Sequence, residues 1–414
     1  MKLLSLNSYH YRRGGSDAVY FSTSEMFEKA GWDVACMSMH HPKNVDSPWS
    51  KYFAAEIEYG FEYSLPRKVL LASRAIYNLE AQDRLEELLK VFKPDVAHAH
   101  CLYHHLSPSV LRVLRKHGIP VVLTAHELKT VCPAYTMRNH NGVCEECKSG
   151  SYLPLLRNRC IKGSLAASAV VFLEASLQRR MDTYRECVDV VVCPSQFYQA
   201  KLAEWGWPEH KLRYVPNFFD TGRPLQAVPP GGRFLFFGRL SPEKGLATLV
   251  QAARKSGVAL DLLGDGPQRA ELEALAAGAD NIRFLGYQSG DALWDALRGC
   301  RAVVLPSEWY ENAPMSVLEA YSFGKPVIGA RIGGIPELVV EGKTGWLFPS
   351  GDAAALAQVL GQVDRLPADD WPAIAQSCND FVSERFSRQR YFESMKSIFD
   401  ELIAKKSTQA LHVA

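Results

Sequence analysis

Two glutamates, Glu311 and Glu319, flank the start of a predicted helix. The helix is expected to begin near Pro314, because proline suits the first helical position, where an amide hydrogen would have no partner. The backbone amides of residues 312–316 should then be open and form an anion site for phosphate. From Pro314 to Glu319 a helix rises about 8 Å, about the length of a diphosphate. The two carboxylates can therefore hold hydroxyls at opposite ends of a nucleotide diphosphate.

A second stretch, residues 238–245, suits the phosphates of the same ligand. It reads GRLSPEKG and follows the first predicted strand of the second half. Arg239 offers a planar fork of donors, and Lys244 offers a mobile point charge. Without a metal ion, these two cations can neutralise the charge that develops on a leaving diphosphate. The sequence has no Asp-x-Asp pair, which weakens any mechanism in which a divalent ion bridges the diphosphate to two carboxylates.

The paired glutamates and the segment after them carry a family resemblance. Glu311 and Glu319 are separated by seven residues and precede the run GKPVI at residues 324–328. In this pattern the chain resembles the retaining glycosyltransferases of family 4, which have the two-domain GT-B architecture. The resemblance extends over nearly the whole chain and is strongest at residues 233–352. It implies transfer of a sugar from a nucleotide sugar with the anomeric configuration kept.

The resemblance also implies roles for single residues. Glu311 would bind sugar hydroxyls, Glu319 the ribose, and the turn with Arg239 and Lys244 the diphosphate. A front-face route, in which the leaving phosphate deprotonates the acceptor, needs no protein nucleophile, and no cofactor is expected for catalysis. The predicted catalytic residues are His126, Glu311, Arg239 and Lys244, and the predicted donor-binding residues are Gly15, Arg239, Lys244, Gly286, Tyr287, Glu311, Asn312, Ala313, Pro314, Met315 and Glu319.

Four of these residues belong to other parts of the pattern. Gly15 lies in the run GGSD after the first predicted strand, which resembles the N-terminal glycine loop of the family. It can also simply permit a turn with positive φ. His126 ends a strand and resembles the family's histidine beside the donor sugar, although Glu127 follows it where the family more commonly has aspartate. Base contacts are expected from the backbone around Gly286 and Tyr287.

Four of the ten cysteines cluster in a polar stretch that cannot build its own core. Two of them have the Cys-x-x-Cys spacing typical of structural zinc, and a metal ion is a plausible way to order such a loop. We therefore predict a structural zinc site, with free thiols or an iron–sulfur cluster as the alternatives. The predicted ligands are Cys132, Cys144, Cys147 and Cys160.

The elements that must position these residues alternate between short apolar strands and amphipathic helices, which predicts doubly wound parallel sheets. Ligands of such sheets bind outside the carboxyl ends of the strands. We predict an α/β protein of the GT-B type, with two Rossmann-like doubly wound domains facing each other across a cleft. The predicted parts are an acceptor domain at 1–215 with a Cys-rich insertion near 130–162, a proline-rich linker at 216–232, a nucleotide-sugar domain at 233–390, and a C-terminal helix and tail at 391–414, for which packing on the first domain is one option.

The amino-acid composition limits the classes of partner that the protein can have. Hydrophobic residues make up 47% and charged residues 22% of the chain, as in globular proteins. The net charge of +2 is too small to attract nucleic acid as the main partner. No apolar run is long enough to cross a bilayer, so a cytoplasmic protein is expected. A predicted helix at 66–76 carries Arg67, Lys68 and Arg74 beside apolar side chains, so peripheral contact with an anionic membrane at its inner face is one option.

The predicted function is transfer of a sugar from a nucleotide diphosphate sugar to a saccharide or lipid-linked saccharide, in polysaccharide or glycolipid biosynthesis. Two alternatives belong to other classes. One is another GT-B sugar-phosphate enzyme, a phosphorylase or a nucleotide-sugar epimerase. The other is a protein that binds a sugar nucleotide without catalysis. A nicotinamide enzyme is disfavoured, because Arg269 stands where the dinucleotide fingerprint after Gly264 requires its third glycine.

Overall fold

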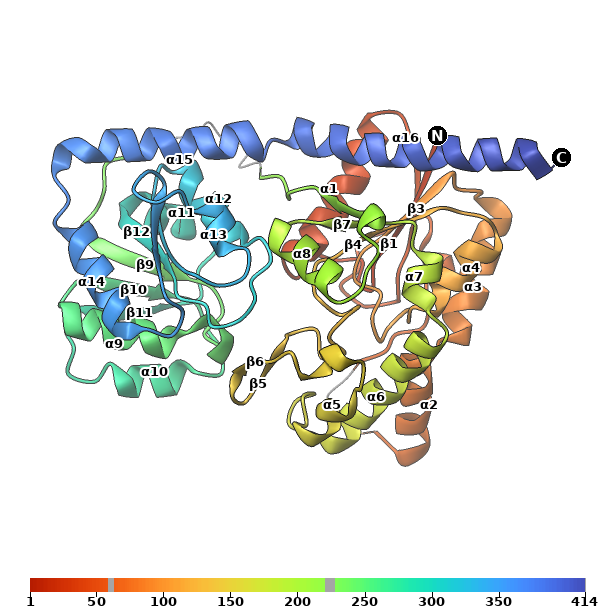
Figure 1. Ribbon diagram of the computed structural model, residues 1–414, viewed down its shortest axis with the longest axis horizontal. Coiled ribbons are helices and arrows are strands. Elements are labelled where there is room, and N and C mark those ends of the chain that lie inside the picture. Colours follow the sequence, from red (N-terminus) through yellow and green to blue (C-terminus); the bar gives the residue numbers. More distant parts are fainter. Residues whose placement is uncertain (59–62, 220–227, 414) are drawn as a thin grey trace. The chain divides into compact units, whose positions relative to one another are not determined.

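The computed structural model describes residues 1–58, 63–219 and 228–413, and the side chains up to residue 408 (Figure 1). Residues 220–227 of the predicted linker lie outside this part of the chain. The chain forms two compact units. Unit 1 consists of Met1–Pro194, Tyr198–Val215 and Phe392–Ala414, and unit 2 consists of Ser195–Phe197 and Pro216–Tyr391.

Unit 1 is built on a parallel six-stranded sheet with the order β2-β1-β3-β4-β7-β8. Three of its four inner strands, β3, β4 and β7, are buried along their whole length, as expected for a sheet covered on both faces. The strand order reverses between β1 and β3, which is where doubly wound sheets bind ligands. The strands are β1 (Lys2–Leu6), β2 (Asp33–Met37), β3 (Val96–Ala99), β4 (Val121–Thr124), β7 (Val190–Cys193) and β8 (Leu212–Tyr214).

Helices surround this sheet, and an aromatic cluster joins the first of them to the last. Phe27 of α1 packs against Phe392 and Phe399 of α16, with ring centroids 5.0 and 4.9 Å apart. The C-terminal helix thus contributes its part from Phe392 onward to unit 1. The helices are α1 (Gly15–Lys29), α3 (Leu79–Val91), α4 (Ser109–Lys116), α7 (Thr183–Cys187), α8 (Gln196–Glu204) and α16 (Arg388–Val413).

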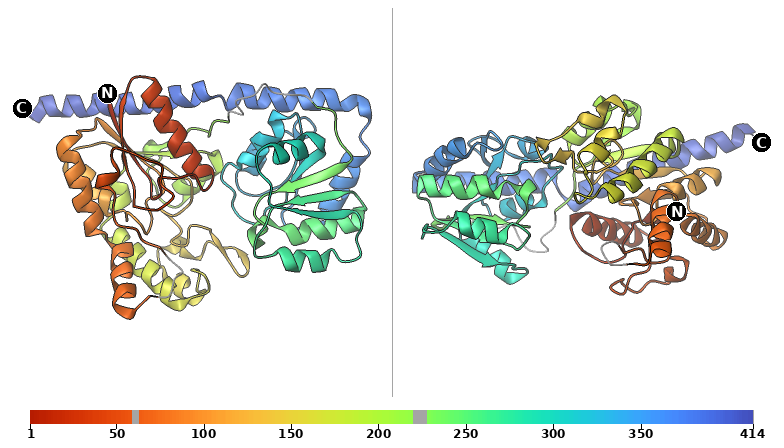
Figure 2. Two further views of the ribbon diagram at one scale, coloured as in Figure 1. Left: turned by 180° about the vertical axis from the view of Figure 1, so that it is seen from behind. Right: turned by 90° about the horizontal axis from the view of Figure 1, so that it is seen from below.

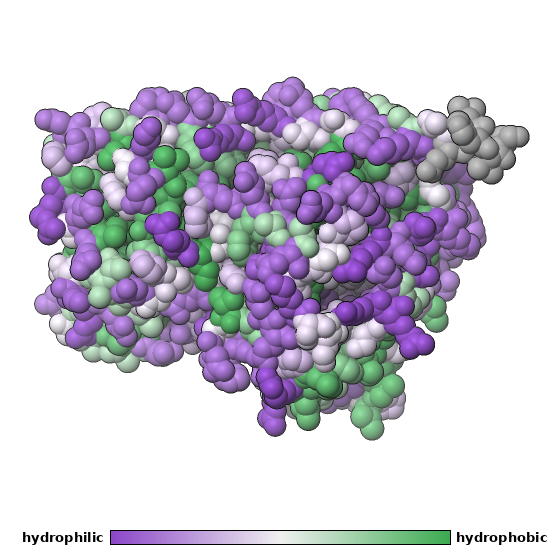
Figure 3. All heavy atoms as spheres, in the orientation of Figure 1, coloured by the Kyte–Doolittle hydropathy of each residue, from purple (hydrophilic) through white to green (hydrophobic). Residues whose placement is uncertain are grey.

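A second group of elements in unit 1 holds the cysteine-rich segment. Helix α2 (Leu65–Ile76) packs on α6 (Leu165–Arg180), and α5 (Leu153–Arg157) also packs on α6. The only strands in residues 125–165, all of which are described, are β5 (Arg138–Asn139) and β6 (Gly142–Val143). Figure 3 shows hydrophobic side chains at the lower end of this group. The exposed large apolar residues of α2, α5 and α6 are Leu65, Val69, Leu70, Leu153, Leu165 and Leu173.

Unit 2 is a second parallel six-stranded sheet, with the order β11-β10-β9-β12-β13-β14. This is the Rossmann order, and it reverses between β9 and β12. Helix α14 packs on α9 on one side of the sheet, and α15 packs on α12 on the other (Figures 1 and 2). The elements are β9 (Arg233–Phe237), α9 (Leu246–Ser256), β10 (Leu260–Leu263), α10 (Arg269–Leu275), β11 (Ile282–Gly286), α11 (Asp291–Gly299), β12 (Cys300–Leu305), α12 (Met315–Ser322), β13 (Val327–Ala330), α13 (Ile335–Leu338), β14 (Gly345–Phe348), α14 (Ala353–Asp364) and α15 (Trp371–Arg385).

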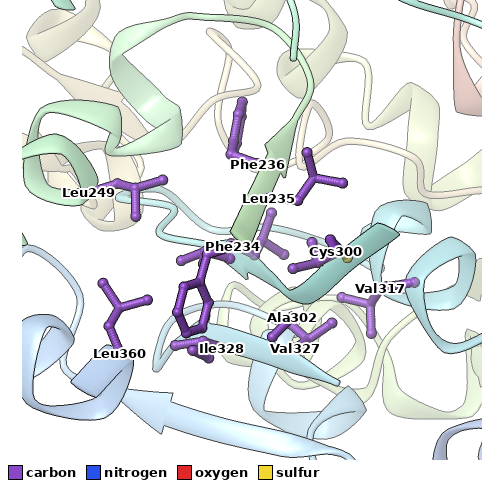
Figure 4. Close-up of a cluster of buried hydrophobic side chains, with 14 of the residues drawn as sticks. Phe234, Leu235, Phe236, Leu249, Cys300, Ala302, Val317, Val327, Ile328 and Leu360 are labelled. Atoms are coloured by element: carbon purple, nitrogen blue, oxygen red, sulfur yellow. The ribbon is translucent and has the colours of Figure 1, made fainter. Parts of the chain in front are cut away.

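The hydrophobic core of unit 2 includes residues of both β9 and α12. Phe234 and Phe236 of β9 are almost fully buried, and Val317 of α12 belongs to the same cluster (Figure 4). The apolar residues of β9 and of the first turn of α12 thus anchor the two elements whose loops lie at the point where the strand order reverses.

The predicted α/β fold with two doubly wound domains of the GT-B type is confirmed. The alternation of short strands and helices that the sequence predicts is present in both units. Among the described helices, none is long and apolar enough to cross a membrane.

Candidate functional site

Two loops of unit 2 meet at the carboxyl edge of its sheet, where the strand order reverses. One follows β9 and ends in a short 3-10 turn at Pro242–Lys244, and the other follows β12. They are joined by a hydrogen bond from the Glu308 amide to the Glu243 carbonyl (2.9 Å). Gly245 has a φ of +66°, and a Cβ at this position would clash with the Pro306 carbonyl. Glycine is therefore required for the turn that presents Lys244 to the second loop.

Lys244 and Glu311 form an ion pair where these loops meet. The Lys244 Nζ donates to Glu311 Oε1 at 2.7 Å, and the Ser307 hydroxyl donates to the same oxygen at 2.7 Å. The Glu311 side chain is only 7% exposed, and the Lys244 ammonium also lies over the Trp309 ring. A cation and a carboxylate are thus held together at a ligand-binding position of the fold, and each keeps hydrogen-bonding capacity for a further partner.

The helix after Glu311 begins one residue later than predicted. Pro314 is the N-cap with extended backbone, and Met315 is the first helical residue. The backbone amides of Met315 and Ser316 therefore have no acceptor within α12. Asn312 and Ala313 lie in the half-buried loop just before the cap. The start of α12, with its open amides and the positive end of its helix dipole, follows directly after the Lys244–Glu311 pair, and the anion site there stays a prediction.

A glycine pair that the sequence analysis did not single out supports this loop. The Gly334 amide donates to the Glu311 carbonyl at 2.8 Å. Gly333 has a φ of +59°, and a Cβ on either glycine would clash with the backbone of Glu311 or Asn312. The signal was present in the sequence as the run RIGGIPE, but only the fold shows that it touches the glutamate loop.

The other predicted donor-binding residues of unit 2 lie outside the Lys244–Glu311 pair. Arg239 is exposed and forms no ion pair with any described residue. Glu319 lies one turn into α12, where burial raises the pKa of its carboxyl to about 7. At the end of β11, the Gly286 carbonyl accepts a hydrogen bond from the Gly264 amide (2.8 Å), and the Tyr287 side chain is 76% exposed.

Unit 1 has its own loop at the reversal point of its sheet. Gly15 is the first residue of α1, and Gly14 before it has a φ of −169°, so the suggested turn with positive φ is wrong. The loop is held by the buried Asp17, which sequence reasoning left without a role. Its carboxylate accepts from Asn7 Nδ2 (2.9 Å) and from the Arg13 guanidinium and backbone amide (3.0–3.1 Å).

His126 lies two residues beyond β4 and is the half-buried end of a row of histidines, of which His98 and His100 are buried. Its Nε2 lies 2.9 Å from Nδ1 of His100, and the two rings are stacked. His98 follows, with its Nε2 2.8 Å from the Thr124 hydroxyl. Burial lowers the pKa of His126 to about 4, so the ring is neutral at physiological pH. His126 is thus a neutral group positioned by a neighbouring imidazole, not a cation.

Two models of known protein families match the chain. A family model described as Glycosyltransferase Family 4 matches residues 13–223, which is half of the chain. The chain belongs to glycosyltransferase family 4. A second model, Glycosyl transferases group 1, matches residues 226–369 and so includes the Lys244–Glu311 pair and α12.

Curated relatives of this family 4 chain match it over part of their length. WcaL of Escherichia coli K12, described as a putative colanic acid biosynthesis glycosyltransferase, is 28% identical over 231 residues, which are 52% of this chain and 57% of WcaL. The sulfoquinovosyl transferase SQD2 of Arabidopsis thaliana is 28% identical over 289 residues, which are 66% of this chain and 51% of SQD2. The chain thus spans little more than half the length of these relatives.

Solved structures resemble the chain over almost its whole length. HepE of Anabaena, in complex with UDP and glucose, has a TM-score of 0.66 at 17% identity and covers 97% of this chain and 100% of its own. Sucrose-phosphate synthase from Thermosynechococcus elongatus has a TM-score of 0.67 at 20% identity, with coverage of 98% and 99%. These similarities support the GT-B fold.

The family 4 chain also has a cavity of about 650 Å³ within unit 1. Apolar residues of α2 and α6 form one wall, and His104 and His105 line another part. Tyr135, Ile161 and Lys162 reach the cavity from the cysteine-rich segment. The cavity combines an apolar wall with three charged residues, Lys68, Lys162 and Glu58.

The four clustered cysteines lie together around a second, smaller cavity of unit 1. All four are free thiols. The structure therefore brings Cys132, Cys144, Cys147 and Cys160 to one place, although they are spread over a stretch of 29 residues.

Proposed function

We propose that the protein is a glycosyltransferase that moves a sugar from a nucleotide diphosphate sugar to a saccharide or lipid-linked saccharide, with retention of the anomeric configuration. The observation that carries this proposal is the Lys244–Glu311 ion pair beside the open amides of α12, at the reversal point of the unit 2 sheet. Relatives named for colanic acid and lipopolysaccharide core biosynthesis support a setting in polysaccharide or glycolipid assembly.

In this proposal unit 2 binds the donor. The α12 amides and Lys244 bind the diphosphate, with Arg239 turning in from its exposed position, and Glu311 accepts hydrogen bonds from sugar hydroxyls. Glu319 binds the ribose hydroxyls, and the exposed Tyr287 ring lies at the end of β11 where the base is expected. A cation that already neutralises Glu311 leaves this carboxylate able to accept neutral hydroxyls without an uncompensated buried charge.

The proposed reaction needs no protein nucleophile. The bond between the anomeric carbon and the diphosphate oxygen breaks, and a bond from the acceptor oxygen to the same face of that carbon forms. The acceptor proton passes to an oxygen of the leaving diphosphate. Lys244, Arg239 and the helix dipole stabilise the charge on that group, so we infer that added divalent metal is not required.

The proposed acceptor site is the 650 Å³ cavity of unit 1. Its apolar wall suits the hydrocarbon part of a lipid-linked saccharide, and Lys68 and Lys162 suit an anionic linkage such as a phosphate.

A donor panel tests the proposed function. We expect the nucleoside diphosphate with one particular base, and the nucleotide sugars with that base, to raise the Tm of the protein, both with and without EDTA. With that donor and a membrane-extracted acceptor fraction, the product should carry the donor's anomeric configuration by NMR. Donor binding with no transfer to any acceptor would leave a binding protein, and conversion of the donor to another nucleotide sugar would indicate an epimerase. Transfer that requires added magnesium would contradict the inferred metal independence.

We also propose peripheral contact of the α2–α6 end of unit 1 with anionic membranes. Leu65 is 74% exposed and Val69 is 62% exposed, next to Arg67 and Lys68 on the same helix. Arg74 is held by Glu80 at 3.3 Å and is not available for lipid.

Sedimentation with vesicles containing phosphatidylglycerol tests this contact. We expect salt-sensitive binding to the vesicles. In the double variant Leu65→Gln, Val69→Gln the bound fraction should fall at least about three-fold, because each substitution removes apolar area that would be buried in the membrane surface. Leu79→Gln, an equally exposed leucine at the start of α3, is the control and should bind as the natural protein does. Absence of binding to anionic vesicles would refute the proposal.

A further inference from the structure

The small cavity with four cysteines has a lining that suits a positively charged metal. Cys132, Cys144, Cys147 and Cys160 all line it, and Arg138 lines it as well. Four sulfur ligands in a tetrahedron are the usual donor set of a structural zinc ion. In the described part of the chain, no histidine lies among the lining residues of this cavity. The donor set is therefore purely sulfur, which favours zinc over magnesium or calcium.

The Arg138 side chain gives an independent indication of a negative group in this cavity. Its Nε is buried and has no hydrogen-bond partner among the described residues. An unpaired buried donor of a charged group is unfavourable by about 1–3 kcal/mol. A zinc ion with four thiolates carries two negative charges, and its sulfurs would accept a hydrogen bond from this nitrogen.

The segment around the cysteines has little else to order it. Its regular structure is the two-residue strands β5 and β6, a short 3-10 turn and the five-residue helix α5. Tyr135, Met137 and Arg159, each close to a cysteine, adopt positive φ, which is unfavourable for residues with a Cβ. A metal ion bonded at four points is the kind of constraint that maintains such a backbone.

We propose that Cys132, Cys144, Cys147 and Cys160 bind one structural zinc ion. No three of the four sulfurs all lie within 4.8 Å of one another, because within residues 1–58, 63–219 and 228–413 the one group of three or more metal-ligating side chains that meets this limit is His41, Glu56 and Glu58. The sulfurs must therefore move closer together to bind zinc. Zinc–sulfur bonds of about 2.3 Å place the sulfurs about 3.8 Å apart. Cys144, Cys147 and Cys160 are half-exposed on a loop surface, so rotation of their side chains can close the shell.

The consequence is a metal-dependent wall of the larger cavity in unit 1. Tyr135 follows Cys132 by three residues, and Ile161 and Lys162 directly follow Cys160. All three line the 650 Å³ cavity. Zinc would thus fix the residues that we assign to the acceptor side, and this part of the inference rests on the proposed function, whereas the metal site itself does not.

Metal analysis of the full-length protein, purified without chelator and under reducing conditions, tests the site. We expect on the order of one zinc ion per chain, with four sulfur neighbours at about 2.3 Å by X-ray absorption. Cys144→Ser and Cys160→Ser should each lose most of the zinc, whereas Cys187→Ser, a buried cysteine outside the cavity, should keep it. Stripping zinc from the natural protein should make residues 130–162 more sensitive to protease, which keeps the test valid if a serine variant fails to fold.

Arg138 provides a finer test of the same geometry. Arg138→Gln should release zinc to a competing chelator on the order of ten-fold faster than the natural protein. Arg180→Gln, an exposed arginine at the end of α6, is the matched control and should leave the rate unchanged. Protein without bound metal, iron with visible absorbance in place of zinc, disulfide bonds between these cysteines, or zinc that persists in both serine variants would overturn the proposal.

Discussion

Replacing Glu311 with glutamine should lower kcat for sugar transfer by about 10²–10³-fold and change the Kd for the nucleoside diphosphate by less than about three-fold. The substitution keeps the shape of the side chain and a carbonyl oxygen that Lys244 and Ser307 can still bind. It removes the charge that strengthens hydrogen bonds to sugar hydroxyls as the anomeric carbon becomes electron-poor. The expected effect is therefore on the reacting sugar, not on the diphosphate. Steady-state kinetics and calorimetric titration with the nucleoside diphosphate measure the two quantities.

Glu308→Gln is the matched control for this variant. Glu308 lies in the same loop, but its carboxylate accepts from the Thr248 hydroxyl at 2.6 Å and so serves to fasten α9. We expect a change in kcat of less than about three-fold for this variant. Unchanged transfer by Glu311→Gln, or an equal loss in Glu308→Gln, would remove the assignment of Glu311 to the donor sugar.

Much of this site could be predicted from the sequence because its parts are local. The start of α12 follows from one proline, and the turn at Lys244 follows from its glycines and proline. A helix terminus and a turn each depend on a few neighbouring residues, so spacing alone is informative. The alternating strands and helices likewise determine the fold class without knowledge of strand order.

The contacts between distant segments could not be predicted in this way. Lys244 and Glu311 are 67 residues apart, and nothing in either motif states that they form an ion pair. The pairing exists because β9 and β12 are neighbours in the sheet, and strand order is a property of the whole domain. The row of histidines could not be predicted for the same reason, because His100 and His126 meet only through the pairing of β3 with β4.

Lys244→Met should lower kcat by about 10³-fold and also destabilise unit 2 by about 1–3 kcal/mol. The first effect comes from the loss of the cation that stabilises the leaving diphosphate. The second arises because the Glu311 carboxylate is almost buried. Without Lys244 it would keep the hydrogen bond from the Ser307 hydroxyl but lose the cation that compensates its charge. Thermal unfolding and transfer kinetics measure the two effects on the same protein.

The double variant Lys244→Met, Glu311→Gln separates the structural role of the pair from its catalytic role. It removes both charges, so no uncompensated carboxylate stays buried, and most of the lost stability should return. Transfer should stay within about ten-fold of the slower single variant, because two groups that act on one transition state as a unit are not additive. Stability losses that simply add would show that the ion pair does not couple the two residues in the folded state. Rate losses that multiply would show that Lys244 and Glu311 act independently on the diphosphate and the sugar.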